Sequence, residues 1–450
     1  MKKRFYEGLI LFFSILKWFF LSSIIGVIVG FSTTIFLKLL NLSIEFTNSF
    51  SFYFLLLPIA FFLCIIITKY LAPDAEGHGT EKVIEAIHKR NGKINPMVVP
   101  IKLITTIMTL ALGGSAGKEG PCAQIGAGLS SIFCDLFKFN DNDRKKLVIC
   151  GISAGFAAVF GTPIAGAIFG VEVLVVGSIL YDVLLPSFIA GITSFQISSV
   201  LGIKYYYHPL NFTLNFNEIF FINILFAGIF FGICSFLFIE VLKLFKYLSE
   251  KIQVWPPLKG IIGGFVLIIL SFIFSKQFLG LGLNTIEDSL QGLNIVWYAF
   301  ILKIIFTSIT LNWGGSGGII TPIFFIGATS GTFFANIFHL DKSIYAPIGM
   351  VSLLAGAANT PIAASILAVE LFGSKIAPYV AVACIVSFLM TGYRSVYPSQ
   401  MIGIRKSASI NVELGEEMNN LKTQNRPQNE KIIRVILSVV NKIKVRIFEK

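Results

Sequence analysis

Charged side chains are scarce in this chain. They make up 13% of its 450 residues, whereas about 25% is usual for a soluble domain. Hydrophobic residues account for 55% of the sequence. A soluble globular domain of ordinary composition is therefore excluded, and the composition indicates a protein that spans a membrane.

Cysteine and histidine are also sparse, with six and four residues respectively. The cysteines lie in or beside apolar segments and show no metal-like pairing, so we expect them to pack in the interior, and we expect neither a metal nor a cofactor. They are Cys64, Cys122, Cys134, Cys150, Cys234 and Cys384.

Several apolar runs are too short for a straight membrane span, which needs about 20 residues. Residues 101–112, 261–274 and 378–390 are examples. Broken backbone is tolerated at membrane depth only where protein buries it or water reaches it. The sequence therefore predicts an all-α, polytopic membrane protein with tilted and broken helices.

The formal net charge is +12, but the basic residues cluster at the ends of the chain and in loops. This placement argues against nucleic-acid binding and, by the positive-inside rule, predicts a multi-pass protein of the inner (plasma) membrane with both termini cytoplasmic. The basic ends comprise Lys2, Lys3, Arg4, Arg426, Lys431, Arg434, Lys442, Lys444, Arg446 and Lys450.

The two ends of the chain carry further signals. The start is similar to a signal peptide, but its apolar stretch runs on without a small-residue cleavage site, so we expect it to be retained. Near the other end, apolar residues recur at helical spacing over 432–448. They predict a basic amphipathic helix, either on the inner leaflet or on a protein partner.

The sequence contains an internal duplication. A glycine-rich phrase at residues 113–121 recurs at 314–322, and the phrase Thr-Pro-Ile-Ala occurs at 162–165 and again at 360–363. Duplicated halves in transporters are commonly related by a pseudo-twofold axis, with the substrate site between them.

The duplication suggests four segments. They are an N-terminal cytoplasmic segment with the first helix (1–50), a first membrane repeat (51–210), a second membrane repeat (211–400) and a basic cytoplasmic tail (401–450). The tail is too short for a sizeable regulatory domain.

Each glycine-rich break precedes a candidate helix start. In the first copy, glycines free the backbone to turn, and Pro121 is suited to the first helical turn. The leading N–H groups of a helix lack partners within it, so such a start can bind an anion. In the second copy, Ile319 and Ile320 would supply these N–H groups. Two converging starts would hold an anion without a cationic side chain that slows its release.

Glu119 lies inside the first break. A carboxylate at membrane depth costs about 2.5 to 3.5 kcal/mol on insertion scales and marks a functional site. We interpret Glu119 as a gate that competes with the anion for N–H groups and moves away or is protonated to let it pass. The alternative is a glutamate that only caps its own helix. Lys118 either pairs with Glu119 or attracts anions.

Two other motif readings are weaker. Residues 113–118 are one residue short of a nucleotide-binding P-loop, and Glu119 stands where a magnesium-binding Ser or Thr is needed. Ser115 lies in a GxSxG pattern, which would make an intramembrane hydrolase a remote alternative. That motif requires a strand before the serine, whereas apolar helical sequence precedes it here.

Four motifs together resemble the CLC family of chloride channels and anion/proton exchangers. Residues 77–80 (GHGT) are similar to the family's GSGIP, 117–121 (GKEGP) to GREGP and 318–322 (GIITP) to GIFAP, while Tyr397 matches a late tyrosine. The resemblance covers most of the chain and, with the short tail, fits bacterial members without CBS domains. It implies a homodimer with one pore per subunit, each built from two inverted-topology repeats.

The resemblance also implies site residues. Glu119 would be the gate, with the position-78 side chain, Tyr397 and backbone N–H groups around the anion. The resulting anion-binding candidates are His78, Gly79, Lys118, Glu119, Gly120, Gly318, Ile319, Ile320 and Tyr397.

Two positions depart from the family's pattern. His78 replaces the serine of the first motif, and its ring either donates to the anion or lies in a vestibule without contact. Val173 occupies a position where proton-coupled members commonly carry an inner glutamate, and valine cannot relay a proton. The neighbouring Glu172 and its counterpart Glu370 are interpreted as helix-end or loop-anchoring carboxylates.

The function expected from these features is passive, chloride-selective conduction gated by Glu119. Other halides and nitrate are further candidate anions. The alternatives are chloride/proton antiport and fluoride export.

Overall fold

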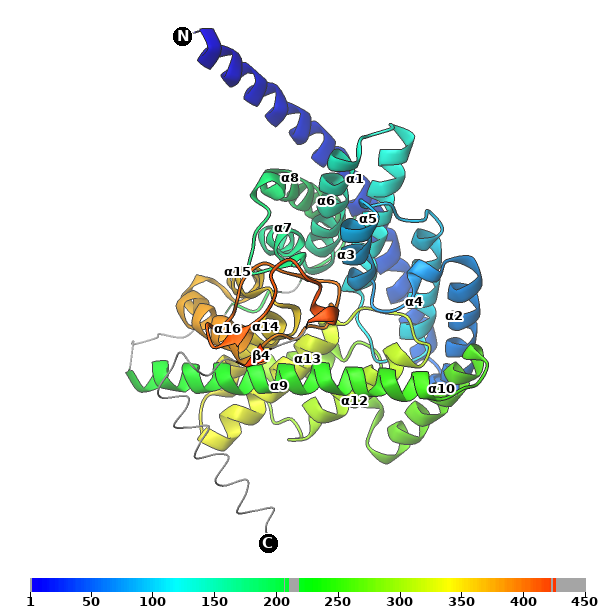
Figure 1. Cartoon of the computed structure of the whole chain (residues 1–450). Helices are drawn as coiled ribbons and strands as arrows, with labels where there is room; N and C mark the ends of the chain where they lie inside the picture. The colour runs from blue at the N-terminus through cyan, green and yellow to red at the C-terminus, as the bar shows by residue number, and fades with distance from the viewer. Residues whose placement is uncertain (1, 206, 210–217, 422–423, 426–450) are drawn as a thin grey trace.

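The computed structural model describes residues 2–205, 207–209, 218–421 and 424–425, and this part of the chain is mainly helical, as the sequence predicts (Figure 1). The predicted amphipathic helix at 432–448 lies outside the described residues. The α-helices are α1 (Lys2–Asn48), α2 (Leu57–Leu71), α3 (Thr80–Lys89), α4 (Val98–Ala111), α5 (Glu119–Leu136), α6 (Asp141–Phe160), α7 (Pro163–Glu172), α8 (Tyr181–Val200), α9 (Glu218–Lys251), α10 (Pro256–Ile273), α11 (Leu283–Leu290), α12 (Ala299–Asn312), α13 (Ile320–Phe338), α14 (Lys342–Ala358), α15 (Pro361–Phe372) and α16 (Ala377–Thr391).

Helix lengths confirm that long spans and short helices are mixed. Within the described ranges, seven helices are long and apolar enough to cross a membrane, namely those built on α1, α2, α8, α9, α10, α13 and α16. The apolar helices α4, α7, α12, α14 and α15 are shorter. Such short helices expose their ends within the protein, so polar groups from other elements must satisfy them.

Short 3₁₀ turns and strands complete the described structure. The turns are η1 (Tyr53–Leu56), η2 (Pro73–Ala75), η3 (Lys276–Phe278), η4 (Ser374–Ile376) and η5 (Met418–Asn420). The strands are β1 (Val175–Val176), β2 (Met401–Ile402), β3 (Ile410–Asn411) and β4 (Gln424–Asn425). β1 pairs with β2 in parallel and β3 with β4 in antiparallel. The first pair attaches the segment after α16 to the end of α7.

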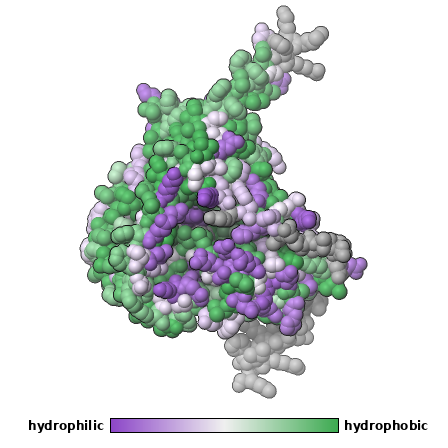
Figure 2. Space-filling view, turned by 180° about the vertical axis from the view of Figure 1, so that it is seen from behind, coloured by the Kyte–Doolittle hydropathy of each residue, from purple (hydrophilic) through white to green (hydrophobic). Residues whose placement is uncertain are grey.

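The two glycine-rich repeats place α5 and α13 in the interior. Of the long spans, α13 has the most buried 18-residue window, at 83%. Figure 1 shows α9 crossing in front of α13 and the start of α1 projecting from the body. All six cysteines are buried and free, in agreement with a packing role. On the face in Figure 2, hydrophilic residues gather around a hollow beside hydrophobic surface.

The two halves contact each other through reciprocal carboxylates. Glu172, at the end of α7, accepts hydrogen bonds from the N–H groups of Ile362 and Ala363 at the start of α15, at 3.0 and 2.7 Å. Glu370, near the end of α15, accepts the equivalent bonds from the start of α7, also at 3.0 and 2.7 Å. The two helices therefore run antiparallel, and the anchoring roles predicted for both glutamates are confirmed.

A second reciprocal set joins the glycine-rich breaks to the short helices α4 and α12. The N–H group of Ser115 donates to Thr310 Oγ1 at 3.0 Å, and that of Ser316 donates to Thr109 Oγ1 at 2.9 Å. Each break is thus held by a threonine from the other half of the chain. This exchange is the arrangement expected of inverted-topology repeats.

Two fully buried lysines occupy equivalent positions in the two halves and make equivalent contacts. Lys102 on α4 donates to the carbonyl oxygens of Ala75 and Gly77, and Lys303 on α12 donates to those of Phe278 and Gly280. Buried ammonium groups need such partners because burial removes their hydration. Each lysine therefore ties a non-helical connection to a short helix.

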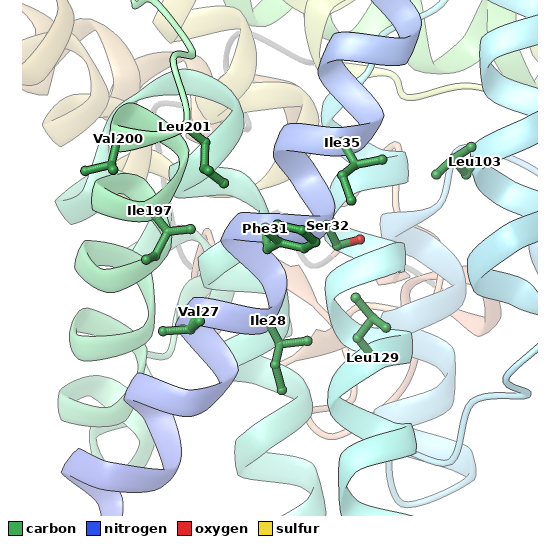
Figure 3. A pocket seen from close by; sticks show the side chains of 10 residues that line it. All are labelled: Val27, Ile28, Phe31, Ser32, Ile35, Leu103, Leu129, Ile197, Val200 and Leu201. Atoms are coloured by element: carbon green, nitrogen blue, oxygen red, sulfur yellow. The ribbon is translucent and has the colours of Figure 1, made fainter.

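An apolar groove of about 630 Å³ lies on the side of α1, between α5 and α8. Figure 3 shows Phe31 of α1, Leu129 of α5 and Ile197 of α8 around it, and Ser32 is the one polar residue in its lining. Its lining includes neither a charged group nor a helix N-terminus, so the groove offers no anion-binding group of the kind that the glycine-rich breaks provide.

Candidate functional site

The glycine-rich breaks of the two halves meet in the interior. Gly117 donates its N–H to the carbonyl of Gly318 at 2.7 Å, and Gly318 returns the bond at 2.5 Å. Each glycine lies two residues before a helix start, since α5 begins at Glu119 and α13 at Ile320. This isolated pair of backbone hydrogen bonds therefore fixes two helix N-termini beside each other, as the sequence predicts.

Residues 77–80, the first of the four motifs, contact the place where the two breaks meet through their backbone. Gly79 has φ +86°, and a Cβ at this position would lie 2.5 Å from the carbonyl oxygen of Gly120. A Cβ on Gly318 would lie 2.8 Å from the backbone nitrogen of Gly120. Real Cβ atoms do not approach backbone so closely, so three motifs separated in sequence require glycine here.

Glu119 reaches across to the other half. Its side chain is buried, with 1% of the residue exposed. One carboxylate oxygen accepts the backbone N–H of Thr321 at 3.1 Å, and the other accepts the Thr321 hydroxyl at 2.5 Å. The alternative that Glu119 caps its own helix is therefore wrong. The carboxylate instead occupies two donors of Thr321 at the start of α13.

The backbone N–H groups that the sequence predicts around the anion differ in whether they are free to donate. Ile319 and Ile320 are buried at the start of α13, where the leading N–H groups have no partner within the helix. The N–H of Gly318 already donates to Gly117. Gly318 therefore shapes the site but has no backbone donor left for an anion, which corrects the expectation from the sequence.

Lys118 precedes α5 and is half-buried. Within the described ranges, no ion pair connects it to Glu119 or to another carboxylate. The pairing alternative is thus not observed. The cation remains near the site, where its charge favours anions over distances of several ångströms.

Three polar side chains with buried, poorly satisfied atoms lie close to this point. The rings of His78 and Tyr397 lie 5.6 Å apart, and Tyr397 is fully buried. The Tyr397 and Thr80 hydroxyls interact with each other but have no further hydrogen-bond partner, and His78 Nδ1 is buried without one. Buried polar atoms are normally paired, so this cluster marks a place for a hydrogen-bonding ligand. Sequence reasoning missed Thr80, although it directly follows Gly79 in the first motif.

A buried amide network holds the loop of Tyr397. The Tyr397 N–H donates to Ser395 Oγ at 2.9 Å, and the Ser395 hydroxyl donates to Gln400 Oε1 at 2.6 Å. Gln400 Nε2 donates in turn to the Val173 carbonyl at 2.7 Å. Gln400 carries no sequence signal of this role. The loop is therefore attached to the end of α7, at the position where a proton-relaying side chain is lacking.

Comparison with known proteins assigns the chain to a family. The family described as "Voltage gated chloride channel" matches residues 59–392, most of the chain. The chain belongs to this family, the CLC family. Its fold and its function in membrane anion transport follow from this membership, which confirms the resemblance seen in the motifs.

Relatives within the CLC family differ in substrate. The chain is 33% identical over 399 residues to the "Chloride/fluoride channel protein" of Pseudomonas syringae pv. tomato, covering 87% of this chain and 88% of the relative. It is 25% identical over 347 residues to an H⁺/Cl⁻ exchange transporter of Klebsiella pneumoniae, covering 71% and 72%. The crystal structure of a CLC-type fluoride/proton antiporter superposes with a TM-score of 0.82 at 29% identity, covering 87% of this chain and 99% of that chain.

Ser115 has a packing role in this fold. Its hydroxyl pairs with Thr307 Oγ1 at 3.1 Å, and the residue is fully buried. The remote hydrolase alternative is therefore set aside, because the family consists of transporters and channels rather than enzymes.

Proposed function

We propose that this CLC protein exchanges fluoride for protons across the plasma membrane. Passive chloride conduction was the leading expectation from the sequence, but the similarity to a fluoride/proton antiporter and to a chloride/fluoride channel protein supports the fluoride alternative better. The proposal includes a homodimer with one pathway per subunit and cytoplasmic termini.

The position of Glu119 carries the proposal. Its carboxylate accepts both the N–H and the hydroxyl of Thr321 at the start of α13. An anion that binds this helix start must therefore displace the carboxylate. In a buried site, a displaced carboxylate without hydrogen bonds is unfavourable and is neutralised by taking up a proton. Anion entry and protonation of Glu119 are linked in this way.

The unpaired donors fit a small anion with strong hydration. The Tyr397 and Thr80 hydroxyls interact with each other but with no further group, and Nδ1 of the nearby His78 ring is buried without a partner. Fluoride gives up its water only where several hydrogen-bond donors replace it. His78 in place of a serine adds a ring N–H to this set when Nδ1 carries the proton.

Chloride is the second candidate. The relative from Klebsiella pneumoniae is named for H⁺/Cl⁻ exchange, and helix N-termini with hydroxyl donors also suit chloride. Chloride/proton antiport would use the same link through Glu119. Fluoride/proton exchange and chloride/proton exchange differ in which anion gradient drives proton uptake.

The test uses purified protein in liposomes loaded with potassium fluoride or potassium chloride. A potassium ionophore sets the voltage, an anion electrode records efflux, and a pH-sensitive dye records protons. We expect fluoride efflux to drive proton uptake against a proton gradient, with chloride less effective. Chloride-driven proton uptake would favour the second candidate, and anion efflux without proton movement would refute exchange.

Glu119→Ala provides the mechanistic arm of this test. We expect anion flux to continue while coupled proton uptake disappears, because alanine neither blocks the start of α13 nor binds a proton. Unchanged anion flux together with unchanged proton uptake would show that Glu119 is not the linking residue. Liposomes without protein give the background leak.

A further inference from the structure

Glu81 differs from the other interior carboxylates. Both oxygens of Glu119, Glu172 and Glu370 accept hydrogen bonds from the opposite half of the chain. Glu81 Oε1 accepts the N–H of Ser399 at 2.9 Å and its hydroxyl at 2.5 Å. Glu81 Oε2 is buried without a hydrogen-bond partner. In the described part of the chain, Glu81 Oε2 is the one buried carboxylate oxygen that lacks a hydrogen-bond partner.

The location of Glu81 connects it to the anion site. It directly follows Thr80 at the start of α3, and its partner Ser399 lies two residues beyond Tyr397. The Tyr397 phenol lies within electrostatic range of both Glu81 and Glu119. Figure 1 shows α3 close to the orange and red segment that follows α16. Glu81 therefore lies near the buried tyrosine, and its hydrogen bonds go to Ser399 rather than to the start of α13.

Glu81 lies within one helical turn of partly exposed charged side chains. The residue is only partly buried as a whole, and the adjacent Lys82 and Glu85 form an ion pair at 3.2 Å with side chains 32% and 31% exposed. One turn of helix thus separates a buried carboxylate oxygen from solvent. Glu172 has no comparable freedom, because backbone N–H groups occupy both its oxygens.

We propose that Glu81 is the residue that exchanges protons between the anion site and the aqueous phase reached along α3. This inference rests on the proton exchange proposed above. In the step itself, a hydronium ion transfers its proton to the free Oε2 of the carboxylate: one O–H bond of hydronium breaks, an O–H bond to Oε2 forms, and a water molecule leaves. The same proton later passes from Oε2 to the displaced carboxylate of Glu119, or returns to water, and the Glu81 carboxylate is restored. Val173 does not prevent proton transfer, because this route starts at a different helix.

The electrostatic environment supports this role. Burial raises the pKa of Glu81 to about 7, although the two hydrogen bonds from Ser399 oppose the rise. Glu85 raises and Lys82 lowers the pKa from the same helix, and the Tyr397 phenol faces it from the loop after α16. A carboxyl group with this pKa is present in both protonation states near neutral pH, as a proton carrier must be.

The experiment compares Glu81→Gln with the wild type in the liposome assay. Glutamine keeps an oxygen that accepts from Ser399 but cannot carry the proton. We expect coupled proton uptake to fall by about 100-fold or more, while fluoride or chloride efflux persists. Glu85→Gln, one helical turn away, is the matched control and is expected to retain coupling.

A conservative variant distinguishes proton transfer from a structural role. Glu81→Asp keeps a titratable group and is expected to retain part of the proton uptake, with a shifted pH profile. Wild-type coupling in Glu81→Gln would overturn the inference. So would a parallel loss of anion and proton flux in both variants, since that is the result of a purely structural role.

The wild-type measurement separates the two proposals. If the wild type moves no protons, the proposed exchange fails and the inference falls with it. If the wild type couples protons and Glu81→Gln does so equally, only the role of Glu81 is refuted.

Discussion

The contact between Glu119 and Thr321 allows a quantitative prediction for Glu119→Gln. The native carboxylate accepts two hydrogen bonds at the start of α13, at 3.1 and 2.5 Å. Hydrogen bonds to a charged group are worth about 1.5–3 kcal/mol, against about 0.5–1.5 kcal/mol for neutral pairs. A neutral glutamine therefore holds this position less strongly, by about 2–3 kcal/mol over the two bonds.

This difference should appear in anion affinity, because the side chain and the anion compete for the same donors. A change of 2–3 kcal/mol corresponds to about 30- to 150-fold tighter apparent binding. Calorimetric titration of the purified protein with fluoride and chloride measures it. Because glutamine cannot take up or release a proton, the affinity of Glu119→Gln should also depend less on pH than that of the wild type.

Glu370→Gln is the matched control. Glu370 also accepts two backbone N–H groups across the halves, but at the start of α7 rather than α13. We expect its anion affinity and pH dependence to match the wild type. Competition at α13 would be refuted if Glu119→Gln bound anions with wild-type affinity and wild-type pH dependence, or if both variants tightened binding equally.

Two further substitutions test the scaffold and the selectivity. Glu172→Ala leaves two N–H groups unpaired at a residue that is 4% exposed. At a cost of about 1–3 kcal/mol for each unpaired group, this variant should lower thermal stability in detergent more than Glu370→Ala does, because Glu370 is only half-buried. Equal losses of stability in the two variants would contradict this expectation. His78→Ser removes the ring near Tyr397 and should shift the ratio of fluoride to chloride flux or its pH dependence, whereas no shift in either would place His78 in a vestibule without anion contact.

Much of the candidate site was predictable because it depends on local sequence. Glycine-rich breaks predict helix starts whose free N–H groups can bind an anion, and helices do start directly after both breaks in the structure. The duplicated Glu172 and Glu370 were also interpreted correctly, since identical spacing after Thr-Pro-Ile-Ala puts each at the end of a short helix.

Other contacts could not be read from the sequence because their partners are distant in the chain. The N–H of Gly318 donates to the carbonyl of Gly117 in the other half and is therefore not free for an anion. Glu119 accepts hydrogen bonds from Thr321 in the other half instead of capping its own helix. Both depend on the register in which the two halves meet. Glycine and glutamate carry no local signal of that register.

The sequence by itself determined that this is a membrane protein with two related halves and broken helices, since apolar content and glycine placement act locally. Tertiary structure alone decided which donors remain free. His78 Nδ1 and Glu81 Oε2 stay buried without a partner, and the Tyr397 and Thr80 hydroxyls have none beyond each other. Hydrogen-bond satisfaction is a property of the whole packed interior, and it is there that the chemistry of this protein is set.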